Sequence, residues 1–269
     1  MDDVDLERKD APPRTVEVTA ELDVRIQRVL ARVKEQAIWK LITDPKADPG
    51  LVRRIAREVY LEIAWYQPDT IEATICTIAQ LPRAIPAKLI RAMLQHQSEE
   101  WDHGEMALRD YVALGGSEEF ARTSRPSPSA YAVASYWRNL AHKRDPVAYL
   151  GALYLFEGLT PLVTGLAKPF LRAKGLAAGM EFVEFHSTED IQHQRMVRGI
   201  IRRVLAMFPE RRDSLIHGLD CFEHIYPIPC WGAAYERALA GGAEILYQGG
   251  YPPDGLHSMV ERVLRPVAR

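Results

Sequence analysis

A long apolar run with one carboxylate at its centre sets the strongest limit on how this chain folds. Residues 149–167 contain no charged residue except Glu157, and Pro161 follows one turn later. The run approaches the length of a transmembrane helix, but a central carboxylate and a proline are costly in an isolated span. We therefore expect a helix buried inside a soluble protein, in which Glu157 is protonated, paired or bound to a metal.

The rest of the sequence has helical patterning. No segment keeps the period-two alternation of a strand, and β-branched residues do not cluster between turn residues. We expect the helix over 51–81 to be interrupted at Pro68 and the long apolar helix to bend at Pro161 and Pro169. The chain is thus predicted to be all-α, with a disordered arm over residues 1–16 and a single helical domain over residues 17–269. The expected helices cover residues 20–43, 51–81, 86–114, 127–143, 146–174 and 176–208.

Charge and cysteine content exclude several classes of protein. The formal net charge is −2, and the basic residues are scattered, so no nucleic-acid partner is expected. Three cysteines, Cys76, Cys221 and Cys230, are too few for a disulfide framework. Their odd number favours reduced thiols in a cytoplasmic protein that has no membrane partner.

Two short motifs carry metal-ligand residues at helical spacing. His186, Asp190 and His193 stand at positions i, i+4 and i+7, which point within about 60° of one another on an α-helix. Glu100 and His103 are three residues apart and adjacent on a helix face, although such pairs are also common on protein surfaces. The alternative for both motifs is a solvated helix face.

Together with Glu157, the motifs supply three carboxylates and three imidazoles. These ligand types suit two octahedral iron or manganese ions, because structural zinc favours tetrahedral sites and often cysteine. Helical bundles build such sites from side chains on separate helices that point inward. The alternative for Glu157 is a buried ion pair with an arginine such as Arg198.

At this point the sequence resembles the haem-oxygenase-like non-haem diiron oxidases and oxygenases. Their pattern is a Glu and a His on one helix, a Glu on a second and His-x3-Asp-x2-His on a third. This chain has these parts in that order, and the resemblance spans roughly residues 50 to 240. The matching residues are Glu100, His103, Glu157, His186, Asp190 and His193.

The resemblance implies a haem-oxygenase-like helical bundle with the metal site between core helices. It also implies two Fe(II)/Fe(III) ions, O2 as co-substrate, a small-molecule substrate and an electron donor where turnover requires one. Members decarboxylate fatty acids, fragment amino acids, form nitriles or oxygenate amines. We therefore expect an O2-dependent oxidase or oxygenase of a small carboxylate-bearing metabolite, a fatty acid or amino-acid derivative. C–C cleavage, decarboxylation, desaturation and N-oxygenation stay open as outcomes, and a homodimer is the candidate assembly.

Other residues near these motifs are candidates for supporting roles. One branch of the group has its first carboxylate seven residues before the helix His, where this chain has His96. We expect His96, Tyr154 and Arg198 to support a ligand or contact substrate, with packing or a surface ion pair as the alternative. Glu62, or Glu58 on the same helix, is a candidate extra ligand, with a place on the surface as its alternative.

Three other readings of the motifs remain. A ferritin-like diiron protein would share Glu100-x2-His103, but its second Glu-x2-His would need Glu where Asp190 stands. A cofactor-independent TenA-like or PQQ-synthesis-like enzyme would share the fold, and TenA-type hydrolysis would need a cysteine nucleophile, for which Cys76 is a weak candidate. The last reading is a non-enzymatic helical metal-binding protein.

Overall fold

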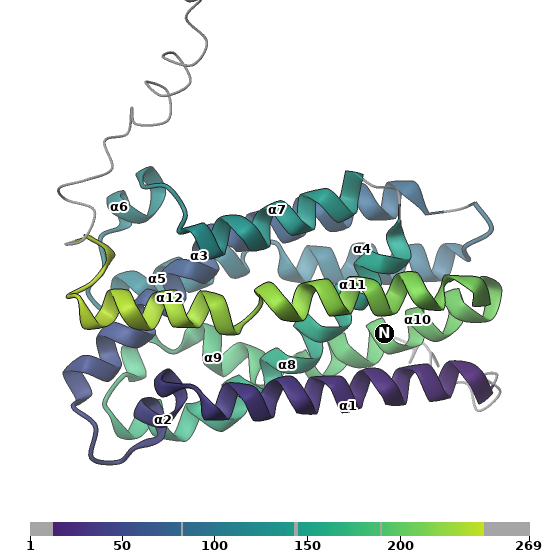
Figure 1. The fold of residues 1–269 in the computed structure, drawn as a ribbon. Coiled ribbons are helices and arrows are strands. Elements are labelled where there is room, and N and C mark those ends of the chain that lie inside the picture. Colours follow the sequence, from purple (N-terminus) through teal and green to yellow (C-terminus); the bar gives the residue numbers. More distant parts are fainter. Residues whose placement is uncertain (1–12, 82, 143–144, 189, 245–269) are drawn as a thin grey trace, which may run out of the picture.

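The protein is a bundle of helices, as the sequence pattern predicts. The computed structural model describes residues 13–81, 83–142, 145–188 and 190–244, without the side chains of residues 13, 14, 190 and 191, and this part contains no strand. The helices, drawn in Figure 1, are α1 (Pro13–Glu35), α2 (Ala37–Thr43), α3 (Pro49–Gln80), α4 (Ala87–Glu100), α5 (His103–Ala113), α6 (Glu118–Thr123), α7 (Pro128–His142), α8 (Pro146–Ala173), η1 (Ala177–Gly179), α9 (Glu181–His186), α10 (Asp190–Met207), η2 (Pro209–Arg211), α11 (Arg212–Ile225) and α12 (Ile228–Leu239).

Helix α8 contains the apolar run and forms the centre of the bundle. It packs against α11, α10 and α1, and in Figure 1 it lies behind α1 and α11. Helix α8 is long and apolar enough to cross a membrane, but 72% of its most apolar window is buried inside the protein. It is therefore a core helix, and Glu157 is buried with it, at 3% exposure.

Two glycines let α8 and α11 cross at close range. A Cβ atom on Gly151 would overlap the carbonyl oxygen of Leu215, and one on Gly218 would overlap the carbonyl oxygen of Ala148. The helices therefore meet backbone to backbone at this crossing. The contact holds α11 against α8 half a dozen residues before Glu157.

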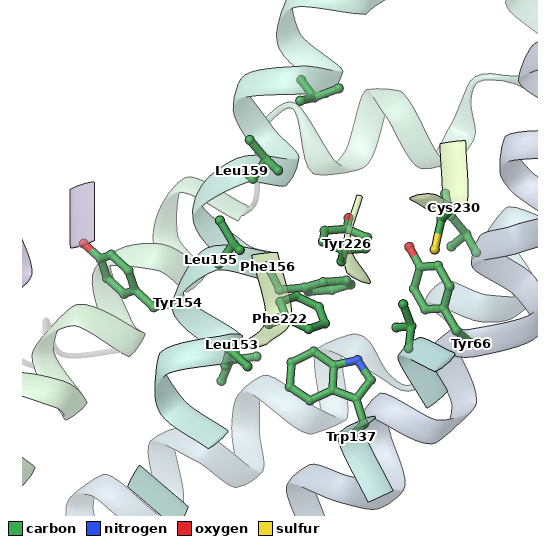
Figure 2. Close-up of a cluster of buried hydrophobic side chains, with 14 of the residues drawn as sticks. Tyr66, Trp137, Leu153, Tyr154, Leu155, Phe156, Leu159, Phe222, Tyr226 and Cys230 are labelled. Atoms are coloured by element: carbon green, nitrogen blue, oxygen red, sulfur yellow. The ribbon is translucent and has the colours of Figure 1, made fainter. Parts of the chain in front are cut away.

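A cluster of aromatic side chains fixes α8 beside Glu157. The ring centroid of Phe156 lies 5.2 Å from that of Tyr226 and 6.0 Å from that of Trp137. Phe222 stacks on Tyr226 with centroids 5.0 Å apart, and Figure 2 shows these rings gathered on one side of α8. Burial of large aromatic rings is a major source of stabilisation, so the helix has little freedom to rotate at this point.

Several helix boundaries differ from those expected. Helix α1 begins at Pro13, inside the expected arm, and the first expected helix is divided at Gln36. Helix α3 runs unbroken through Pro68, where an interruption was expected. Helix α8 is also unbroken at Pro161 and Pro169, and the bends expected there stay a prediction. A proline removes one hydrogen bond from a helix. Packing of the long helices against their neighbours outweighs that loss, because tertiary contacts supply most helical stability.

Candidate metal centre

Both sequence motifs are interrupted by a helix break. Helix α4 ends at Glu100 and α5 begins at His103, whereas α9 ends at His186 and α10 begins at Asp190. The sequence predicted one continuous helix through each motif, and that prediction is wrong. His186 and His193 therefore do not share the face of one helix. The side chain of Asp190 lies outside the described part of the structure.

Four buried side chains form a first group, which we call the first metal position. It contains His96 and Glu100 from α4, Glu157 from α8 and His193 from α10, with one ligand atom of each within 4.8 Å of the others. His96 Nε2 lies 3.2 Å from Glu157 Oε1. His193 Nδ1 lies 3.2 Å from Glu100 Oε1 and 3.6 Å from Glu157 Oε2. Three helices thus bring two imidazoles and two carboxylates to one point.

A second group, the second metal position, shares Glu100 with the first. It consists of Glu100, His103 and His186, all buried and within the same 4.8 Å limit. His103 Nδ1 lies 2.7 Å from Glu100 Oε2, and His186 Nε2 lies 3.1 Å from His103 Nδ1. Glu100 directs Oε1 toward the first position and Oε2 toward the second. A carboxylate in this orientation can bridge two metal ions.

One hydrogen bond fixes the orientation of His186. Its Nδ1 donates to the carbonyl oxygen of Phe182 at 2.7 Å, and the Phe182 ring stacks on the imidazole with centroids 3.7 Å apart. The proton is therefore on Nδ1, and Nε2 keeps its lone pair directed into the second position. Metal-binding histidines are commonly held in this way.

The carboxylates have the ionised form that a metal requires. Burial raises the pKa of Glu100, but contacts with His103 and His193 more than offset this and hold the pKa well below its usual value. Burial also raises the pKa of Glu157, but the charge of His96 and the hydrogen bonds with His193 and His96 together outweigh it, so this pKa is lowered as well. Ionised carboxylates are the ligand form that binds a metal.

The imidazoles at the two positions differ in the direction of their pKa shifts. Burial and the neighbouring His103 lower the pKa of His186 to about 4, so this ring is neutral near pH 7. Burial lowers the pKa of His96 too, but the charges of Glu157 and Glu100 and the hydrogen bond with Glu157 together more than offset it and raise this pKa. A metal ion at the first position would take the place of a proton on His96, since imidazole binds metals in its neutral form.

The residues present fit a metal pair. Glu100 Oε1 is buried, yet within the described residues it makes no hydrogen bond. Its ion-pair contacts are with His193 Nδ1 at 3.2 Å and His96 Nε2 at 3.7 Å, and a cation bound among these groups would satisfy the buried oxygen. The two groups contain imidazoles and carboxylates without cysteine, which suits iron or manganese better than a structural zinc.

The structure places the other candidate residues outside both groups. Arg237 binds Glu62 at 2.6 Å and Glu58 at 3.1 Å, and both glutamates are fully buried where a surface position was the alternative. Arg198 pairs with Asp23 at 2.9 Å, so the arginine proposed as an ion-pair partner for Glu157 is engaged elsewhere.

Tyr154 also lies outside both metal positions, on the side of α8 that faces α1. Its hydroxyl donates to Asp23 at 2.6 Å, and the Arg198 guanidinium lies over its ring. His96 was expected only in a supporting role, although the structure places it among the four side chains of the first position. The signal was its spacing: His96 stands one turn before Glu100 and two turns before His103.

Comparison with known proteins agrees with this arrangement. A family profile described as an iron-containing redox enzyme matches residues 61–226, more than half of the chain. This range contains every residue of both metal positions. No curated protein sequence matches the chain.

Two solved structures share the fold. One is a domain of unknown function with a haem-oxygenase-like fold from Shewanella denitrificans OS217, with a TM-score of 0.64 and 20% identity over 88% of this chain and 96% of that one. The other is a TenA homologue from Pseudomonas syringae pv. tomato DC3000, with a TM-score of 0.60 and 15% identity over 83% of this chain and 93% of that one. The fold is therefore haem-oxygenase-like, as the resemblance implied. With the family profile spanning the buried His/Glu groups, the chain belongs to the family of iron-containing redox enzymes.

Proposed function

We propose that this protein is an O2-dependent non-haem diiron oxidoreductase, an oxidase or oxygenase. The observation that carries the proposal is the pair of buried ligand groups joined by Glu100. When bound, two iron ions would supply the electrons that reduce O2 and the oxidising power that acts on the substrate. An electron donor is required where the reaction does not itself return the iron to Fe(II).

The side chains have distinct parts in this proposal. Glu100 bridges the two positions, while His96, Glu157 and His193 complete the first and His103 and His186 complete the second. Asp190, at the start of α10, is proposed as a further ligand on the sequence pattern alone. Burial of both groups excludes bulk water from the reaction.

The substrate class follows from the family resemblance and is part of the proposal. We propose a small carboxylate-bearing metabolite, a fatty acid or amino-acid derivative, oxidised in the cytoplasm by decarboxylation, C–C cleavage, desaturation or N-oxygenation. The free cysteines, Cys76, Cys221 and Cys230, agree with a reducing compartment.

Iron stoichiometry tests the proposal directly. The full chain is loaded anaerobically with Fe(II), desalted and assayed for iron per chain, beside the variants Glu100→Gln and Glu105→Gln. Glu105 is an exposed carboxylate close to the centre in sequence that pairs with Arg122, so it provides a matched control. We expect close to two irons in the parent and in Glu105→Gln, a large loss in Glu100→Gln, and a transient visible absorption band after O2 is added. Equal iron retention in all three proteins would refute the proposal.

A further inference from the structure

A narrow apolar cavity adjoins the second metal position. It has about 100 Å³ of space open to the centre of a water-sized sphere. Its lining comes from α2, α3, α8, α9 and the start of α12, and it includes His186 of the second position and Gln67 of α3. Gln67 and Ala56 mark its extent on α3, about 16 Å apart along the helix axis at the usual rise per residue. Because so small a volume extends over this length, the cavity is narrow.

The wall of the cavity offers almost no polar group. Its lining contains no lysine, arginine, aspartate or glutamate. The hydroxyl of Thr160 donates to the Phe156 carbonyl and that of Thr164 to the Thr160 carbonyl, both at 2.8 Å. The Tyr60 hydroxyl donates to the Gly179 carbonyl at 3.0 Å. These three hydroxyls give their protons to the backbone. Tyr66 and Tyr226 also line the cavity, and most of the remaining wall is hydrocarbon.

A polar side chain, Gln67, lines the cavity at the end beside the second metal position. Gln67 Nε2 donates to Glu100 Oε2 at 3.3 Å, which ties this side chain to the bridging carboxylate. Gln67 is 2% exposed, and its Oε1 has no hydrogen-bond partner within the described residues. A buried acceptor left without a donor costs free energy. A ligand that brings an O–H or N–H group to Gln67 Oε1 would recover it.

We infer that the cavity binds the unbranched hydrocarbon chain of a carboxylic acid substrate, whose carboxyl group enters in its protonated form and donates to Gln67 Oε1 beside the second metal position. This inference rests on the proposed function and narrows its substrate class. A free amino acid carries an ammonium group in addition to its carboxyl, and the lining contains no carboxylate that could pair with that ammonium. A single hydrocarbon tail fits the narrow wall and requires no charged partner.

Straight-chain primary alcohols test the cavity without any reaction. Hexanol, octanol and decanol are titrated into the metal-free full chain by isothermal calorimetry, beside the α,ω-diol of each length. Burial of each methylene contributes about 0.8 kcal/mol, so each added carbon should tighten binding about fourfold. The diol should bind at least tenfold more weakly than its parent alcohol, because its second hydroxyl would be buried against a wall that is largely hydrocarbon, where Thr160, Thr164 and Tyr60 already donate their protons to the backbone.

Two variants on neighbouring positions of α8 locate the binding. Ala167 lines the cavity, whereas Leu166, the preceding residue, is exposed. Ala167→Phe should weaken decanol binding at least tenfold and hexanol binding less, and Leu166→Phe should change neither. Gln67→Met should weaken all three alcohols by a similar factor, because it removes the acceptor for the head group. Circular dichroism checks that each variant folds.

The outcomes separate this inference from the proposed function. Affinity that is independent of chain length, diols that bind as tightly as alcohols, or a folded Ala167→Phe variant that binds decanol like the parent would each overturn it. If Ala167→Phe does not fold, the comparison of alcohols with diols in the parent still decides. The metal is absent from these titrations, so a chain that retains no iron but shows the expected series would sink the diiron proposal alone.

Discussion

Glu100 Oε2 and His103 Nδ1 meet at 2.7 Å although the two residues lie in different helices, on either side of a break. The break turns the start of α5 so that His103 faces the second position, while the preceding turn of α4 directs His96 at the first. Glu100, the last residue of α4, stands between them. One short segment thereby supplies ligands to both metal positions.

His96 should contribute to one metal position only. Its Nε2 lies 3.2 Å from Glu157 Oε1, and it is absent from the second group. We expect His96→Ala to lower retained iron from close to two per chain toward one, since a lost ligand weakens the first position while His103 and His186 remain. Gln95→Ala, at an exposed neighbouring position, is the control. Iron assay after desalting gives the stoichiometry, and loss of both irons would contradict the division into two positions.

Arg237 should matter for stability and not for metal binding. It is buried between Glu58 and Glu62, which are both fully buried. Removal of one partner leaves uncompensated buried charge, so Arg237→Met should lower the free energy of unfolding by about 3–5 kcal/mol. Urea denaturation measures this loss. At a temperature where the variant is folded, its iron content should equal that of the parent; selective loss of iron would instead favour Glu62 as a ligand.

Gly218 should tolerate no side chain. A Cβ atom there would overlap the Ala148 carbonyl oxygen and push α11 away from α8. We expect Gly218→Ala to lower the free energy of unfolding by about 1–3 kcal/mol, the usual cost of overpacking, despite the higher helix propensity of alanine. Gly165→Ala on α8, where a Cβ atom would meet nothing within 4 Å, should be neutral or slightly stabilising. Equal melting temperatures for the two variants would argue against a close crossing.

Asp110 should give the protein a pH-dependent stability. Its carboxylate accepts the backbone N–H groups of Glu181 and Phe182 at the start of α9, and burial raises its pKa to about 6. Between about pH 4 and pH 6 the folded protein retains a proton that the unfolded chain has released. Stability therefore falls as the pH rises through this window, by about 1.4 kcal/mol per unit at most, and then levels off.

The comparison with Asp110→Asn isolates this effect. The amide does not titrate, so the difference in unfolding free energy between parent and variant should change across that window and be constant above it. Urea denaturation at a series of pH values measures the difference. A difference that is flat between pH 4 and pH 6, or that changes with the opposite sign, would show that Asp110 is ionised throughout the window.

The fold and most of the centre could be predicted from sequence because they depend on local pattern. The apolar run with Glu157 at its middle required a buried helix, and α8 is one. The helix breaks at Trp101 and after His186 could not be predicted, because neither Trp101-Asp102 nor Ser187-Thr188 contains a proline or glycine. His96 was not recognised as a ligand for the same reason. In one continuous helix it would lie on the same face as Glu100 and His103, whereas the break lets His96 and His103 point to different metal positions.

The turns that interrupt the two motifs make the centre depend on loop geometry as well as on helix packing. Each break places one histidine at the second position and another at the first, so an ion at the first position would hold α4, α8 and α10 together and an ion at the second would hold α4, α5 and α9 together. Metal binding should therefore stabilise the conformation of these two turns, and a change in either turn should alter the affinity for the metal. An insertion of one residue in either turn would leave every ligand in the sequence and yet dismantle the centre.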